Sequence, residues 1–422
     1  MVHSYEYKKT KGGICMNIFD IMSETKVNVG LSNYSIRIMG NSGKGKTSLY
    51  SYFAKELSKR EYGGQKVCAL IPLEDRYNHI DGLIILRPTL KDNMGRPVLD
   101  ENGKPKTKKI VETWEDFVEI VDMLVDAKKT IPDFPIQRVC IDTTTKLEML
   151  AQERVVRLNF EVNKKLQDFN EVFGGYGRGY TKAIEVTREQ KQKLIHVGYK
   201  VDQCVQTRVK SQVQPISGME YHINSSDSAE GYDGKVFLQD ADISFHIVEE
   251  AIVKQTGTAR GKVLNGMEIQ GKVLVLDSDG EYKGCKSPFP NTPKTLQADD
   301  FEECMKNYFD LFETRMSEMA GIKKEDYNRK VELEKNNQME VLKDSIKLDD
   351  INKHQDDKSD NIKRFIEYFE GIKPQMPSEA LKQWNDYFME LIKMTQSNDL
   401  LEALNKIDDN SLSAIYQNLN FK

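Results

Sequence analysis

The sequence has no apolar run of the roughly 18 residues that a membrane-spanning helix needs. Its six cysteines never fall in a C-x-x-C pair or a Cys/His cluster, which argues against a zinc site and against a disulfide framework. The first residues also lack the charged and apolar pattern of a secretory signal. We therefore expect a cytoplasmic protein with reduced thiols and no membrane partner.

Charge is unevenly distributed along the chain, whose formal net charge is −5. Residues 151–215 contain twelve Lys and Arg against seven Asp and Glu, whereas residues 295–422 contain eighteen against twenty-seven. This excludes a uniformly basic nucleic-acid-binding protein, but the middle of the chain can still contact phosphate. The acidic C-terminal part favours protein or basic partners over DNA.

The length of 422 residues predicts two or three folding units, since one compact core does not grow to this size. We expect an N-terminal arm at 1–33 and a large core at 34–300, with an inserted hairpin at 87–110. A helical, charged linker region at 301–360 and a small acidic helical domain at 361–422 are predicted to follow.

The strongest motif is a glycine loop between an alternating strand at 35–39 and an unbroken helical stretch at 48–57. It has the P-loop pattern G-x-x-x-x-G-K-[ST] in the strand–loop–helix setting that this pattern requires. Its glycines let the backbone turn around a phosphate, and the helix adds the positive end of its dipole. Lys46 is predicted to reach the β- and γ-phosphates of ATP, and Thr47 to ligate Mg²⁺. The predicted nucleotide-binding residues are Gly40, Asn41, Ser42, Gly43, Lys44, Gly45, Lys46, Thr47 and Ser48.

Two later apolar strands are predicted to end near carboxylates at one edge of the sheet. The run at 66–71 leads to Glu74, and the run at 136–142 ends in Asp142 followed by threonines. In P-loop enzymes an aspartate at the end of a strand like the second of these holds Mg²⁺, so Asp142 is predicted to be a metal ligand. Glu74 is assigned to orient the attacking water, because ligands of open α/β folds bind at this edge. An ordinary acidic loop residue is the alternative for Glu74.

A glycine-rich segment between two predicted helices carries Tyr176, Arg178 and Tyr180. Tyrosines on a mobile loop beside an arginine can stack on the bases of single-stranded DNA. A packed turn whose glycines permit tight geometry fits the same residues equally well.

The next predicted strand, at 198–206, ends in Gln206 and continues into Arg208 and Lys210. A polar residue at the end of a core strand is placed to sense the γ-phosphate, so Gln206 is the predicted sensor.

The insert at 87–110 is polar, rich in turn dipeptides and basic near its end. Its basic cluster offers either a contact to phosphate or the charge of a solvated loop. The cluster consists of Lys104, Lys106, Lys108 and Lys109.

The last strands are predicted to extend a mainly parallel sheet in the antiparallel sense. We expect a strand at 237–249, a hairpin turn at Asn265-Gly266, a strand at 272–276 and a second turn at Asp279-Gly280. Helix dominates from residue 298, interrupted by a charged stretch at 349–360 that is predicted to be a linker. The predicted fold class is therefore α/β, a P-loop NTPase core with a C-terminal helical extension.

With these motifs and predicted elements in this order along the chain, residues 30–310 resemble the phage-encoded nucleotide-binding proteins of the RecA-like recombination ATPase group. The specific motifs are the P-loop at 40–47 and the strand at 139–142. Weaker matches in order and spacing are 176–180, 198–210, 241–243 and 286–289. Relatives carry a histidine at the position of Gln206 and an arginine at that of Pro288, so the chemistry of the sensor differs here.

The resemblance implies a RecA-like core that uses Mg·ATP, binds single-stranded DNA and assembles with itself into a ring or filament in the cytoplasm of a bacterial host. In such cores the loops after central strands face the DNA channel, so Arg208 and Lys210 join Tyr176, Arg178 and Tyr180 as DNA-binding candidates. Residues 311–422 are not explained by the resemblance.

Two functions remain open. The first is an ATPase that acts on single-stranded DNA in recombination or annealing, as an oligomer. The second is a nucleotide-dependent switch or loader that hydrolyses slowly and docks a replication or recombination protein through its acidic helical tail. Acceleration of ATP turnover by single-stranded DNA would separate them. A helicase or packaging motor would need a translocation channel, which the sequence does not identify.

Overall fold

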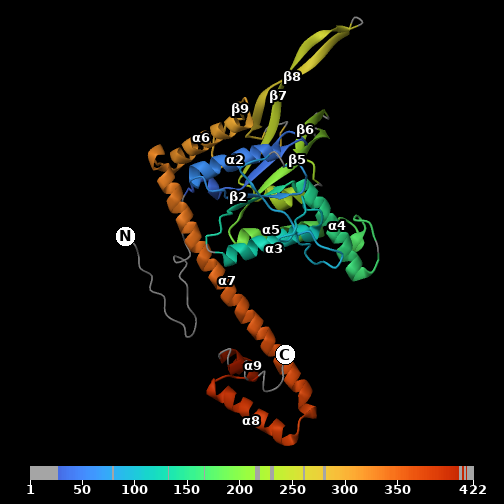
Figure 1. Ribbon diagram of the computed structural model, residues 1–422, viewed down its shortest axis with the longest axis vertical. Coiled ribbons are helices and arrows are strands. Elements are labelled where there is room, and N and C mark those ends of the chain that lie inside the picture. Colours follow the sequence, from blue (N-terminus) through green and yellow to red (C-terminus); the bar gives the residue numbers. More distant parts are fainter. Residues whose placement is uncertain are drawn as a thin grey trace. The chain divides into compact units, whose positions relative to one another are not determined.

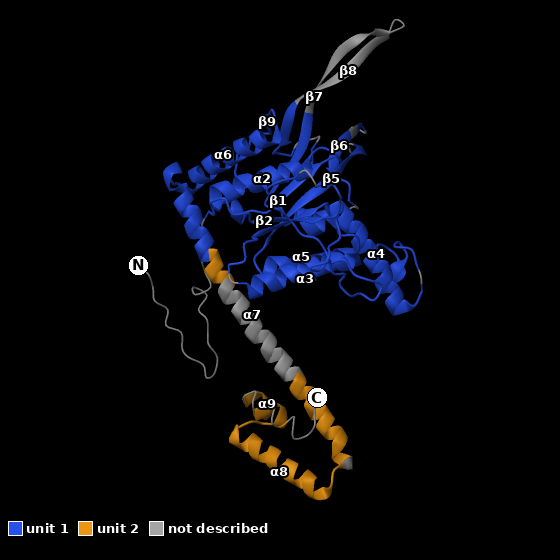
Figure 2. Ribbon diagram, viewed as in Figure 1, with its two compact units in different colours: residues 1–337 blue, residues 338–422 orange. Residues whose placement is uncertain are grey.

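The computed structural model describes residues 27–415 except 78–79, 132, 166, 214–218, 229–231, 260–261, 279–281, 408–410 and 413–414. The chain divides into two compact units, residues 1–337 and 338–422 (Figure 2). In the described part of the chain, no helix is both long and apolar enough to cross a membrane.

The first unit is built on one sheet whose strands follow the spatial order β3-β2-β4-β5-β1-β7-β8-β9, with β6 paired to β5 outside this path. β3, β2, β4, β5, β1 and β7 run parallel, whereas β6, β8 and β9 add in the antiparallel sense. The strands are β1 Ile36–Gly40, β2 Cys68–Pro72, β3 Ile84–Ile85, β4 Arg138–Asp142, β5 Lys200–Val213, β6 Glu220–Ser226, β7 Ile243–Ala259, β8 Lys262–Val275 and β9 Thr295–Ala298.

Helices cover both faces of this sheet, as Figure 1 shows for α2 and α6 on one face and α3, α4 and α5 on the other. Every residue of β1, β2 and β4 is buried, which is why the sequence predicts β2 and β4 as apolar strands. The predicted α/β fold class, with a mainly parallel sheet and C-terminal helices, is thereby confirmed. The helices on the sheet are α2 Lys46–Glu61, α3 Trp114–Thr130, α4 Thr144–Asn163, α5 Arg178–His196 and α6 Phe301–Ala320.

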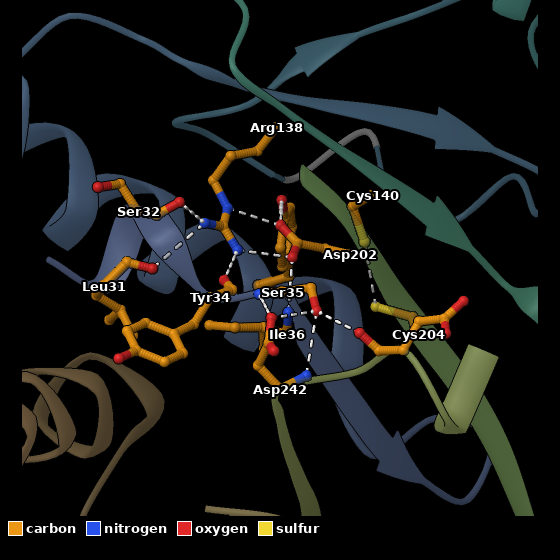
Figure 3. Close-up of polar contacts among 12 residues, drawn as sticks. Leu31, Ser32, Tyr34, Ser35, Ile36, Arg138, Cys140, Asp202, Cys204 and Asp242 are labelled. Carbon is orange, nitrogen blue, oxygen red and sulfur yellow. Dashed lines mark hydrogen bonds and ion pairs between the residues drawn. The ribbon is translucent and has the colours of Figure 1, made fainter. Parts of the chain in front are cut away.

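A fully buried ion pair at the start of β4 ties the N-terminal segment to the sheet (Figure 3). The guanidinium of Arg138 donates to Asp202 on β5 through Nε (2.9 Å) and Nη2 (2.7 Å). Burial lowers the pKa of Arg138, but the Asp202 carboxylate raises it by more, so the side chain stays charged. The backbone carbonyls that accept its other N–H groups belong to Leu31, Ser32 and Tyr34.

This pair fixes part of the predicted N-terminal arm inside the core. Residues 31–33 form the buried 3-10 helix η1 Leu31–Asn33, where Glu61 of α2 accepts from the backbone N–H of Leu31 at 2.7 Å. Residues 29–33 are therefore buried in the core and do not form an arm. The rest of the predicted arm, 1–26, lies outside the described residues.

The antiparallel extension differs from its prediction in two places. Asn265-Gly266 is not a turn but lies within β8, paired with Gln255 and Lys254 of β7. The long ladder continues past it, with an irregularity at Gln255–Gly257, because strand pairing overrides the local preference of Asn-Gly for a turn. The strand predicted from 237 begins only at Ile243, because Phe237 lies in the short helix η3 Gly234–Leu238. The second predicted turn, Asp279-Gly280, lies outside the described residues.

The C-terminal helices also depart from the predicted layout. α6 begins at Phe301 and packs its aromatic residues on α2, so it belongs to the core and not to a linker. The stretch predicted as a linker, 349–360, lies within the continuous helix α7 Tyr327–Ile372. The second unit has its own small core, built around Phe365, Phe369 and Phe388. Its remaining helices are α8 Ser378–Met394 and α9 Leu400–Lys406.

Candidate nucleotide site

The predicted P-loop connects β1 to α2 at the carboxyl end of the sheet. Gly43 and Gly45 adopt left-handed conformations with φ of 79° and 84°, which side-chain-bearing residues rarely adopt. The buried Lys46 folds back over the loop, where its Nζ donates to the carbonyls of Gly40 (3.0 Å) and Asn41 (3.1 Å). Burial lowers the pKa of Lys46. The ammonium group is thus held above the loop that is predicted to surround the phosphates.

Thr47 and Asp142, the two predicted metal ligands, lie in direct contact. The Thr47 hydroxyl donates to Asp142 Oδ2 at 2.5 Å, although 95 residues separate them in the chain. Burial raises the pKa of Asp142 to about 6, while the hydrogen bond from Thr47 opposes that shift. The end of β4 and the first turn of α2 therefore bring a carboxylate and a hydroxyl into contact.

Glu74 lies where the ends of β2 and β4 meet the middle of β5, which continues to Val213 and does not end at Gln206 as predicted. Its Oε1 accepts from Gln206 Nε2 at 2.5 Å and from the Thr143 hydroxyl at 3.2 Å. One residue beyond Gln206, the Thr207 hydroxyl donates to Asn41 Oδ1 at 2.9 Å, so β5 also contacts the P-loop itself. The predicted water-orienting residue and the predicted sensor are thus hydrogen-bonded to each other. Asp75, the neighbour of Glu74, is exposed.

The sequence did not predict three residues that lie at this site, namely Glu249, Lys272 and Phe301. Lys44 of the P-loop donates to Glu249 Oε2 at 2.5 Å, and Lys272 donates to the other oxygen of the same carboxylate at 2.6 Å. Glu249 and Lys272 are register partners on β7 and β8. The Lys272 ammonium lies 5.1 Å from the ring of Phe301, and that ring occupies the space a side chain on Gly45 would need.

The residues predicted to bind DNA are distributed over two places. Tyr176 is fully exposed before α5, where Arg178 donates to the Phe173 carbonyl at 3.1 Å. Tyr180 packs edge-to-face on Phe169, with 4.7 Å between ring centroids. That contact fits the packed-turn interpretation for Tyr180. The two remaining residues, Arg208 and Lys210, lie on β5 beyond Gln206, and Arg208 pairs with Asp227 at 3.0 Å.

Comparison with known families agrees with this geometry. Residues 32–236 match a family model described as an AAA domain. Comparison with curated proteins finds no match for the chain. The match and the site indicate an AAA-type, P-loop NTPase domain, a class whose members bind nucleotide and act as ATPases.

The residues at the site fit Mg²⁺, which prefers oxygen ligands and usually keeps several waters. The Thr47 hydroxyl and the Asp142 carboxylate supply two such oxygens. Among the described residues, no group of three or more His, Cys, Asp or Glu could hold a metal ion, so the other ligands would be phosphate and water. A bound Mg²⁺ would neutralise charge that develops on the phosphates.

The contacts of Glu74 predict a specific defect for its amide variant. Glu74→Gln should bind ATP normally and hydrolyse it about a hundredfold more slowly or worse, because an amide cannot take a proton from the attacking water. Binding of a fluorescent ATP analogue and release of phosphate would measure the two effects. Asp75→Asn is the matched control and should hydrolyse normally. A slow Asp75→Asn beside a normal Glu74→Gln would reverse the assignment.

Proposed function

We propose that this protein is a RecA-like ATPase that acts on single-stranded DNA in recombination or annealing, and that ATP hydrolysis or exchange resets its affinity for the strand. Binding that changes with nucleotide state requires an element that contacts both ligands. The observation that carries the proposal is the continuity of β5.

β5 joins the nucleotide site to the basic residues without a break. Gln206 donates a hydrogen bond to Glu74, and Thr207 donates one to Asn41. Arg208 and Lys210 follow in the same strand, which has fourteen residues. Beyond Gln206 the strand leaves the core and pairs only with β6 among the described strands. Because a strand is stiff, a change at Glu74 moves Arg208 and Lys210 with it. Assembly into a ring or filament is part of the proposal, and electron micrographs with and without ATP and DNA would test it.

The rate of ATP turnover with and without an unstructured oligonucleotide tests the proposal directly. We expect single-stranded DNA to accelerate turnover, since the strand and the nucleotide share β5. Turnover that no oligonucleotide changes would contradict it.

Replacing the basic residues should separate DNA binding from nucleotide binding. In the triple variant Arg178→Ala, Arg208→Ala and Lys210→Ala, the log–log dependence of affinity on salt should become shallower by about 2 units, at about 0.7 per phosphate contact. Fluorescence anisotropy of a labelled oligonucleotide over a salt series measures this, and ATP binding should not change. A control variant with Lys59, Lys306 and Arg315 changed to alanine loses the same charge from α2 and α6. If the two variants bind alike, the DNA lies elsewhere.

A nucleotide-dependent switch or loader is the second candidate, favoured by apolar side chains exposed on α8. Tyr387, Met389 and Met394 are 43%, 67% and 72% exposed in the second unit, and such side chains commonly contact other proteins. In this case a replication or recombination protein would dock there, and single-stranded DNA would leave ATP turnover unchanged.

A further inference from the structure

The basic insert, residues 87–110, contains two copies of one small structure. Its stretches 91–98 and 99–106 each have aspartate second, glycine fifth, a basic residue sixth and proline seventh. In both copies the aspartate carboxylate accepts from the backbone N–H groups two and four residues further on, at 2.8 and 2.9 Å. The two glycines have φ of 76° and 74°. Arg96 and Lys104 therefore occupy equivalent positions in two equivalent turns.

The two turns radiate from a closed ring of backbone hydrogen bonds. Leu90 N donates to Lys106 O, Lys106 N to Val98 O, and Val98 N to Leu90 O, all at 2.7 to 2.8 Å. A bridge between Thr89 and Thr107 closes the base of the insert. The predicted single hairpin is thus a stem that carries two turns.

The insert is fixed to the carboxyl end of the sheet. Just after it, Val111 N donates to the carbonyl of Pro72, two residues before Glu74. Lys91 and Lys108 pair with Glu119 and Asp116 on the first turns of α3, at 2.5 and 2.9 Å. The two turns are therefore held at the edge of the sheet that carries the nucleotide site.

The exposed charge of the insert is basic and mostly uncompensated. Residues 87–110 contain seven Lys and Arg against three Asp and Glu, and no aromatic residue. Lys104, Lys106 and Lys109 are exposed and have no ion-pair partner among the described residues, while Arg96 is 70% exposed beside Asp92. Tyr77, outside the insert, contacts Arg87 and the Lys109 carbonyl at its base, but the two turns themselves carry no aromatic residue. Exposed cations in such turns suit contacts to phosphate and not to bases.

We propose that the basic insert is a second binding surface for the phosphate backbone of single-stranded DNA, separate from the residues on β5. The inference rests on the proposed function and adds a ligand surface that the nucleotide site does not use. A repeating polyanion matches two equivalent turns that each present a basic side chain, because neighbouring phosphates are chemically identical. The contact would be independent of base sequence and sensitive to salt.

The variant Arg96→Gln, Lys104→Gln and Lys106→Gln removes this charge and leaves the aspartates, glycines and prolines of the turns in place. We expect weaker binding of a labelled oligothymidine and a log–log salt slope shallower by about 2 units, at about 0.7 per contact. ATP turnover without DNA should equal that of the parent. The matched control changes Lys59, Lys306 and Arg315 to glutamine, with the same loss of charge, and should bind like the parent.

Lysine acetylation read by mass spectrometry gives a second measurement on the unaltered protein. Excess oligothymidine should protect Lys104 and Lys106, but not Lys59. If the variant binds the strand like the parent at every salt concentration, the inference is overturned. Loss of poly-glutamate binding in a variant that still binds DNA would also overturn it, in favour of an acidic protein partner. A parent that binds no single strand would overturn the proposed function together with the inference.

Discussion

Lys46→Ala is expected to lower ATP turnover by about a hundredfold or more, because it removes the cation that stabilises charge on the transferred phosphate. Within the part of the chain that the structure describes, the side chain donates only to two carbonyls of its own loop, so its loss should leave the sheet and the helices intact. Steady-state phosphate release measures the activity, and thermal unfolding checks the fold.

The control for this prediction is Lys59→Ala, which removes an exposed lysine from the same helix, α2. It should retain the turnover of the parent. Near-parental turnover in a folded Lys46→Ala protein would remove the P-loop assignment and every role that depends on it.

Asp202→Asn is expected to lower the free energy of unfolding by about 3–5 kcal/mol, because it leaves the guanidinium of Arg138 buried without a counter-charge. Both residues are fully buried. The carboxylate also accepts from Ile36 N at 2.8 Å through Oδ1 and from the Tyr50 hydroxyl at 2.7 Å through Oδ2, so the amide nitrogen that replaces one oxygen leaves one of these donors without its acceptor. Chemical denaturation would measure the loss.

Glu185→Gln makes the same chemical change in an exposed ion pair with Lys182. Its cost should stay below about 1 kcal/mol, since solvent screens the pair. Equal losses for the two variants would show that Asp202 does not hold Arg138 in the way described.

The parts of the site that the sequence could predict are those set by local pattern. A glycine loop between strand and helix predicts its own conformation. Carboxylates that follow the ends of neighbouring parallel strands must meet at one edge, which is how Glu74 and Asp142 come to lie near each other, whereas Gln206 reaches Glu74 from within β5. The chemical roles of Glu74 and Asp142 stay predictions, but their proximity follows from the ends of two neighbouring parallel strands.

The remaining contacts depend on pairings distant in the chain, which local pattern does not encode. Glu249 and Lys272 reach the P-loop through the register of two antiparallel strands, and Phe301 through the first turn of a helix on the core. Asn265-Gly266 by itself favours a turn, but both residues pair within the longer ladder between β7 and β8. Charges within buried strands call for buried partners, so Arg37, Arg138 and Asp202 are the residues from which buried ion pairs could be predicted.

The position of β7 decides where a working fragment of this protein can end. The matched family segment stops at residue 236, but β7 pairs with residues 36–39 of the central strand β1 through residues 243–246. A fragment cut at that boundary would leave the P-loop strand as an open edge and strip α2 of the aromatic residues of α6. At the other end it would lose Val29, whose N–H donates to Glu334 of α7. Recombinant work on the AAA-type domain should therefore retain residues 27–337, since the stretch that sequence comparison recognises is shorter than the compact unit.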